Sequence, residues 1–110
     1  MCGLFGVYRH EGFSPDDIDR ANRARDTLFH RGPNHGAARI TGDLYHGFRR
    51  LSNIDLSAAG NQPMESADGK VAITVNGEIY NYRELRAELM AKGCVFKSQS
   101  DSEVVLHGYQ

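Results

Sequence analysis

The chain has 110 residues, of which 40% are hydrophobic and 25% charged, and its formal net charge is −1 at pH 7. This composition is typical of one globular domain and gives no electrostatic reason to bind nucleic acid or an anionic membrane. No apolar run approaches the roughly 18 residues of a membrane span, no secretory signal opens the chain, and two cysteines make no disulfide framework, so we expect a cytoplasmic protein.

The N-terminal stretch Met1-Cys2-Gly3-Leu4-Phe5-Gly6 opens a strand predicted over residues 3–8 and carries unusual chemistry. If Met1 is removed, Cys2 bears both a thiol and a free α-amine. The thiolate is the nucleophilic form of cysteine, and an α-amine titrates close enough to neutral pH to accept the thiol proton. A nucleophile and its base would then share one residue. The alternative is that Cys2 is an ordinary residue near a start codon.

The first predicted helix has a strong start signal. Ser14 can cap it and Pro15 suits its first position. The acids at 16 and 17 favour the positive end of its dipole. The helix should end by Gly32-Pro33, because a proline disfavours helix at the residue before it.

Strands and a loop are predicted in the middle of the chain. Strands over residues 36–41 and 44–48 should form a hairpin at Gly42-Asp43. Residues 51–64 have little periodicity and several turn formers, which indicates an ordered loop. Residues 70–76 give the clearest strand, with alternate apolar residues on one face.

A second helix is predicted after this strand. Asn81 with Glu84 resembles a capping box for a helix that runs to about Lys92, and Gly93 stands where it should end. A short strand is expected over residues 94–97.

A third helix is predicted at the end of the chain, where Ser100 with Glu103 repeats the cap pattern. It has no stop signal before Gln110. The five short strands and three helices that are predicted also do not account for complete, closed sheets. We therefore expect the chain to be the N-terminal piece of a longer protein.

Six motifs occur along the chain in a fixed order. They are Met1-Cys2-Gly3-Leu4-Phe5-Gly6, His30-Arg31-Gly32-Pro33, Arg49-Arg50-Leu51-Ser52, Gln62-Pro63-Met64, Asn76-Gly77-Glu78-Ile79-Tyr80-Asn81 and Ser100-Asp101-Ser102-Glu103-Val104. Together, and over the whole chain, they resemble the class II glutamine amidotransferase domain, an N-terminal-nucleophile hydrolase. The version resembled most is the glutaminase domain of glutamine-hydrolysing asparagine synthetase.

The resemblance implies an α+β fold. Family members form a four-layer αββα sandwich of nearly twice this length, so residues 1–110 would be its N-terminal portion, incomplete at the C-terminus. The rest of that domain and the synthetase domain would be absent. The implied reaction is hydrolysis of L-glutamine to glutamate and ammonia through a γ-glutamyl thioester. The parent protein would use the ammonia for ATP-dependent asparagine synthesis from aspartate.

The resemblance also implies partners. They are L-glutamine and the synthetase domain of the parent chain. A homodimer is a further possible partner state, and the charge and the lack of a long apolar run lead us to expect no nucleic acid and no membrane as partners. The resemblance implies no metal and no cofactor in this segment, and ATP and Mg²⁺ in the absent synthetase domain.

The roles of individual residues follow from the same motifs. Cys2 matches the nucleophile, and Asn76 and Gly77 match an oxyanion hole made of a side-chain amide and a backbone N–H. Arg50 matches the clamp for the glutamine α-carboxylate, and Asp101 matches the partner of the α-ammonium.

Further substrate contacts are implied by the same resemblance. They are assigned to Glu78 and to the backbone of Leu51, Ser52, Asn53 and Ile54. Two positions depart from the family pattern, since Asn34 stands where Asp is usual and Asn53 where an apolar residue is usual.

Each assignment has a structural alternative. Arg50 and Glu78 could be solvated surface residues, and Asp101 could be a first-turn acid of the third helix. Asn76-Gly77 could be a hairpin turn, and Tyr80 could belong to the core. For the whole chain, the alternatives are an amidotransferase with another acceptor, such as a sugar or peptide, and an inactive fragment that only associates.

Overall fold

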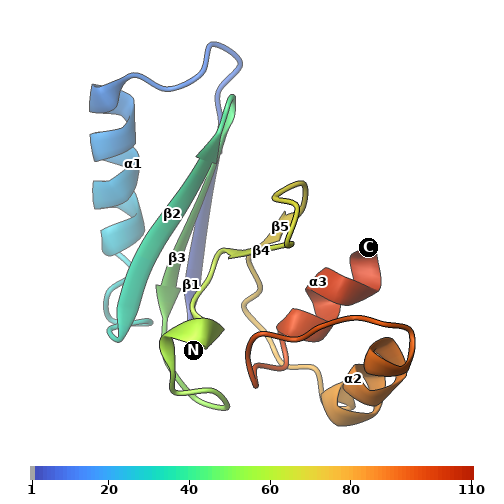
Figure 1. Cartoon of the computed structure of the whole chain (residues 1–110). Coiled ribbons are helices and arrows are strands. Elements are labelled where there is room, and N and C mark those ends of the chain that lie inside the picture. The colour runs from blue at the N-terminus through green and yellow to red at the C-terminus, as the bar shows by residue number, and fades with distance from the viewer. Residues whose placement is uncertain (1) are drawn as a thin grey trace.

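The computed structural model of the chain describes residues 2–110 and shows a mixed α and β architecture (Figure 1). In chain order the elements are β1 (Gly3–Tyr8), α1 (Pro15–Asp26), β2 (His35–Thr41), β3 (Leu44–Arg50), the 3-10 turn η1 (Ala58–Gly60), β4 (Met64–Glu65), β5 (Ala72–Ile73), α2 (Tyr82–Ala91) and α3 (Glu103–Tyr109). Both sheets are antiparallel. This arrangement fits the predicted α+β class.

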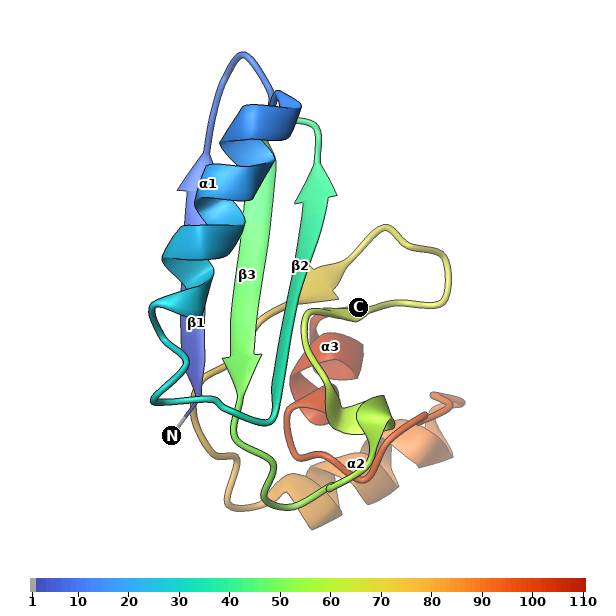
Figure 2. The ribbon, with the colours of Figure 1, turned by 90° about the vertical axis from the view of Figure 1, so that its left-hand side faces the viewer.

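The larger sheet has the strand order β1-β3-β2, with α1 lying over one face (Figure 2). In its register Gly3 pairs with Arg49, and His35 pairs with Arg50. The start of β1 and the end of β3 therefore lie at the same end of the sheet. Tyr45 and Phe48 of β3 are fully buried. Because side chains alternate along a strand, these two anchor opposite faces.

Helix α1 begins where the sequence predicts. The Asp17 N–H donates to Ser14 Oγ at 3.2 Å, and the Ser14 N–H donates to the Asp17 carboxylate at 3.0 Å, which completes a capping box. The helix ends at Asp26, ahead of the Gly32-Pro33 stop. The predicted hairpin at Gly42-Asp43 is also confirmed, and Gly42 has a φ of 55°.

The smaller sheet and the other two helices lie on the side of the larger sheet opposite α1 (Figure 1). In the β4–β5 pair, Met64 pairs with Ile73. Helix α3 packs against both strands, and α2 packs against α3. Met64, Val104 and Leu106 are the buried apolar side chains of this half.

The strand predicted over residues 70–76 is much shorter than expected, because only Ala72–Ile73 pairs with another strand. The reason lies at Val75, whose N–H donates to Gln62 Oε1 at 2.5 Å and whose carbonyl accepts from Gln62 Nε2 at 3.2 Å. A side chain thus takes the place of the neighbouring strand.

The strand predicted over residues 94–97 is wrong, since these residues have no strand partner among residues 2–110. The N–H groups of Lys97 and Ser98 both donate to the Glu103 carboxylate, at 2.8 Å each. This acid therefore satisfies backbone donors that a sheet would otherwise use.

The caps predicted for α2 and α3 also differ. Asn81 precedes α2 but its side chain makes no cap hydrogen bond. Helix α3 starts at Glu103, and Ser100 Oγ accepts from the Ser102 N–H at 3.2 Å. Gly93, with a φ of 98°, does end α2 as predicted. In the described part of the chain, no helix has the length and apolar character to cross a membrane.

Candidate active site

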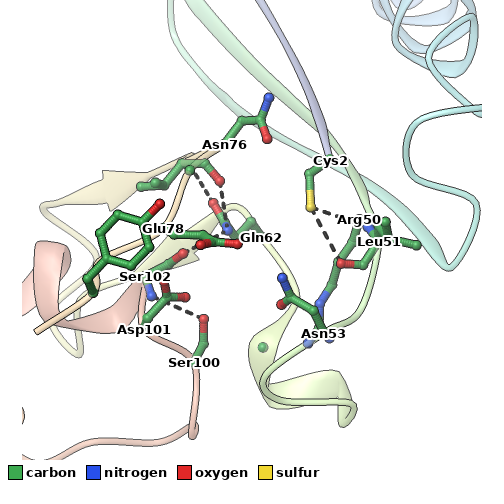
Figure 3. Close-up of a pocket in the computed structure, with 14 residues that line it drawn as sticks. Cys2, Arg50, Leu51, Asn53, Gln62, Asn76, Glu78, Ser100, Asp101 and Ser102 are labelled. Atoms are coloured by element: carbon green, nitrogen blue, oxygen red, sulfur yellow. Dashed lines mark hydrogen bonds between the residues drawn. The ribbon is translucent and has the colours of Figure 1, made fainter. Parts of the chain in front are cut away.

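A cavity of about 480 Å³ lies between the end of β3 and the segment that follows β5 (Figure 3). It brings together most of the predicted site residues, whereas Ser52 and Ile54 do not line it. The lining residues are Cys2, Arg50, Leu51, Asn53, Gly60, Gln62, Val75, Asn76, Gly77, Glu78, Tyr80, Ser100, Asp101 and Ser102.

Cys2 lies half-buried at the edge of this cavity, directly before β1. Its Sγ accepts a hydrogen bond from the Leu51 N–H at 3.3 Å and lies 3.6 Å from the Leu51 carbonyl oxygen. The Cys2 carbonyl accepts from Arg31 Nε at 3.0 Å. The backbone and the thiol are thus both fixed by neighbouring segments. The expected removal of Met1 concerns a residue outside the described range.

Gly32 explains how the loop after α1 reaches this end of the sheet. A Cβ at Gly32 would collide with the backbone of Arg49, and Arg49 Nε donates to the Gly32 carbonyl at 2.8 Å. Only a glycine permits this close approach. Arg31 and Gly32 therefore support Cys2 and the end of β3, a role that the sequence pattern could not assign.

Arg50 is buried, with 5% of its surface exposed, so the solvated-surface alternative is wrong. Its Nη1 donates to the Ser57 carbonyl at 2.5 Å and to Asn61 Oδ1 at 2.9 Å. A side chain at Gly60 would collide with the Arg50 guanidinium. The loop around η1 is therefore shaped to hold this cation against the cavity.

Asp101 is also buried, with 5% of its surface exposed. It lies two residues before α3 begins, and its Oδ2 accepts from the Ile79 N–H at 2.8 Å. Because Asp101 precedes the N-cap residue Ser102, it is not a first-turn acid of that helix, and its contact is to a different segment. The cavity is thus lined by one buried cation, Arg50, and one buried anion.

The segment Asn76-Gly77-Glu78 is exposed at the mouth of the cavity. Gly77 forms a bend without a positive φ, and no strand pairing continues around it, so the hairpin alternative is wrong. The Asn76 side chain extends toward the side where Cys2 lies, and Glu78 points inward (Figure 3). Tyr80 is 92% exposed, which excludes a core role.

The loop after β3 uses some of its backbone donors internally. The Ser52 N–H donates to Asn34 Oδ1 at 2.9 Å, and the Ile54 N–H donates to Asn53 Oδ1 at 2.7 Å. An oxygen at position 34 thus accepts from Ser52 although Asn stands where Asp is usual. Backbone contacts of this loop with a substrate remain a prediction.

The cavity also contains polar residues that sequence analysis did not assign to the site, namely Gln62, Ser100 and Ser102. All three are buried. In the sequence, only their positions inside two of the six motifs indicate that these residues belong to the site. Among residues 2–110, no cluster of three His, Cys, Asp or Glu side chains could hold a metal ion.

Asp55 connects the loop that holds Arg50 to the segment that carries Asp101. Its Oδ1 accepts from the Ser57 N–H at 2.8 Å and the Ser57 hydroxyl at 2.5 Å, and its Oδ2 accepts from the Gln99 N–H at 2.7 Å. The hydrogen bonds from Ser57 and Gln99 hold the pKa of the Asp55 carboxyl below its ordinary value.

Replacing Asp55 by Asn should therefore destabilise the protein in a pH-dependent way. The amide would turn a donor toward the Gln99 N–H, at a cost of about 1–3 kcal/mol. Because folding lowers the pKa, the carboxylate stabilises the fold above about pH 4, the ordinary carboxyl value, and this contribution is lost at lower pH.

Thermal unfolding of D55N and of the unmodified protein from pH 3 to pH 7 checks this expectation. The difference in Tm should be largest at pH 7 and should shrink at acidic pH. D19N, at an exposed position of α1, is the matched control and should change little. A D55N difference of equal size at both ends of the range would contradict the assignment.

Comparison with known proteins gives a consistent family assignment. Residues 1–110 match the model of the family described as glutamine amidotransferase domain. Glutamine-hydrolysing asparagine synthetases 1 and 2 of Bacillus subtilis are 40% and 44% identical to the chain over 112 residues. Asparagine synthetase 1 of Arabidopsis thaliana is 40% identical over 113 residues. All of this chain is covered in each case, but only 18%, 15% and 18% of the respective relatives.

Proposed function

The chain belongs to the class II glutamine amidotransferase domain family, and we propose that its cavity hydrolyses the side-chain amide of L-glutamine to glutamate and ammonia. One observation carries the proposal: a cysteine, a buried arginine and a buried aspartate line the same cavity. A free amino acid carries one negative and one positive head group, and this pair of charges complements them.

Arg50 binds the α-carboxylate in this proposal, since its planar guanidinium suits carboxylate geometry. Asp101 binds the α-ammonium, with Glu78 as a second acid at the mouth of the cavity. Both charges are largely withdrawn from water, so their attraction for the head groups is screened less than at an open surface.

Cys2 performs the chemistry. Its thiolate attacks the γ-carboxamide carbon, and the oxygen becomes an oxyanion that accepts hydrogen bonds from the Asn76 amide and the Gly77 N–H. The α-amine of Cys2 takes the thiol proton and passes it to the leaving nitrogen, so ammonia departs and a γ-glutamyl thioester remains. Water then attacks the thioester, which releases glutamate and restores the thiol.

For the whole protein, we propose that residues 1–110 are the N-terminal portion of a four-layer glutaminase domain. A synthetase domain would use the ammonia, with ATP and Mg²⁺, to make asparagine from aspartate. Support comes from the names of the relatives and from their greater length. A homodimer is part of the same proposal.

Substrate analogues test the proposed recognition in the full-length protein. Glutaramate lacks the α-ammonium group, and 4-aminobutanamide lacks the α-carboxylate. We expect kcat/KM for glutamine to exceed both by roughly 10²-fold or more, because each analogue leaves one buried charge unpaired. Release of ammonia gives the measurement.

Two variants make the test specific to each charge. R50K should reduce the ratio of kcat/KM for glutamine to kcat/KM for 4-aminobutanamide. D101N should reduce the ratio of kcat/KM for glutamine to kcat/KM for glutaramate. Equal hydrolysis of all three amides by the unmodified protein would overturn the assignment of the head-group contacts. Absence of any ammonia release from glutamine would overturn the function itself.

A further inference from the structure

Gln62 imitates a strand partner at the wall of the cavity. It is buried, with 6% of its surface exposed. Its Oε1 accepts from the Val75 N–H at 2.5 Å, and its Nε2 donates to the Val75 carbonyl at 3.2 Å. One side chain therefore satisfies both backbone groups of the residue directly before Asn76.

The register of the small sheet shows which backbone position the Gln62 amide replaces. Met64 pairs with Ile73, so two residues further along the same register Gln62 stands opposite Val75. The Gln62 amide continues the pairing where the backbone does not.

The same amide also reaches the segment that carries Asp101. Gln62 Nε2 lies 3.5 Å from Ser102 Oγ, and Ser102 is buried at the start of α3. Figure 3 shows Gln62 between Asn76 on one side and Ser102 on the other. Gln62 is thus tied to both walls of the cavity, most closely to the backbone at Asn76.

We propose that Gln62 is a positioning residue for the oxyanion hole, an inference that rests on the function proposed above. By fixing both backbone groups of Val75, it sets the direction in which the Asn76 amide and the Gly77 N–H leave the strand. These donors act on charge that exists only in the transition state. Loss of Gln62 should therefore lower kcat more than it raises KM.

The competing explanation is that Gln62 only satisfies buried backbone groups and stabilises the fold. The two explanations differ in their coupling to Asn76. If Gln62 acts through Asn76, the two substitutions must be non-additive, because removal of Asn76 deletes the amide donor that loss of Gln62 has already misaligned. A purely structural residue would contribute independently.

The experiment is a double-substitution cycle in the full-length protein with Q62M, N76A and the combined variant. We expect Q62M to lower kcat for glutamine hydrolysis by roughly 10- to 100-fold, the cost of a displacement of about 1 Å. Q62M should slow N76A by a smaller factor than it slows the unmodified protein, because only the Gly77 N–H is then left to misalign. Q62E, which keeps the acceptor for Val75, is a second variant in case Q62M does not fold, and it should show the same coupling.

Alkylation of Cys2 by iodoacetamide is the second readout. This displacement forms no oxyanion, so its rate in Q62M should stay within about twofold of the unmodified protein if the thiol and fold are intact. The proposal would be overturned if Q62M and Q62E had the kcat of the unmodified protein. It would also be overturned if the fold-decrease in kcat of the combined variant equalled the product of the decreases in Q62M and N76A. If the unmodified protein releases no ammonia from glutamine, the proposed function fails instead.

Discussion

Cys2→Ala should abolish glutamine hydrolysis by the full-length protein, with a loss of at least about 10⁴-fold in kcat. The thiol lies at the cavity edge beside the Leu51 N–H, which donates to its sulfur. Alanine leaves no atom that can form the thioester. Only binding and the oxyanion donors would remain, and these alone give slow hydrolysis. Release of glutamate over time is the measurement.

Cys94→Ala is the matched control, because Cys94 is the other cysteine of the chain and does not line the cavity. Its glutaminase activity should stay within about twofold of the unmodified protein, as for a substitution outside the special sites. If a synthetase domain follows as proposed above, asparagine formation from added ammonia should survive in C2A, since that step does not use the thiol. A C2A protein that still splits glutamine would end the proposal, and retained Met1 in the mature protein would count against the amine as base.

Asn76→Ala should lower kcat for glutamine hydrolysis by roughly 10²–10³-fold, as removal of one oxyanion donor does elsewhere. Its effect on KM should be small, because the ground-state amide oxygen carries little of the charge that forms later. N76D should be slower still, since a carboxylate would repel the oxyanion. Steady-state kinetics gives kcat and KM separately. Trapping of the acyl-enzyme with hydroxylamine measures how fast this intermediate forms.

Asn81→Ala provides the control for this prediction. Asn81 precedes α2, its side chain makes no cap hydrogen bond, and it lies outside the cavity. Its kinetics should match the unmodified protein. If N76A formed the trapped acyl-enzyme at the unmodified rate, Asn76 would not be an oxyanion donor.

Local signals predicted the first half of the fold well. The capping box of Ser14 and Asp17 and the turn at Gly42 depend on residues a few positions apart, so the sequence contains the whole cause. The strand over 70–76 failed for the opposite reason. Its continuation pairs with Gln62, thirteen positions away from Val75, and no periodicity reveals such a partner.

The site could be predicted only through the joint order of its motifs. Arg50, judged alone, has the character of a surface arginine, and its burial depends on Gly60 and the Ser57 carbonyl. The support given by Arg31 and Asp55 is likewise tertiary. A sequence pattern names the residues that react, whereas contacts between distant segments decide how they are held.

The bridge from Asp55 to Ser57 and Gln99 has a consequence for selectivity. It joins the two walls that we propose bind the α-carboxylate and the α-ammonium of an amino acid, so we expect the distance between these walls to be the same for every amino acid that binds. When the α-carboxylate and the α-ammonium are held at a fixed distance, the length of the side chain alone decides whether its amide reaches the Cys2 sulfur. The amide of L-asparagine, which is one methylene shorter than L-glutamine, would not reach the Cys2 sulfur. We therefore expect the protein not to hydrolyse asparagine, the compound that its relatives are named for making.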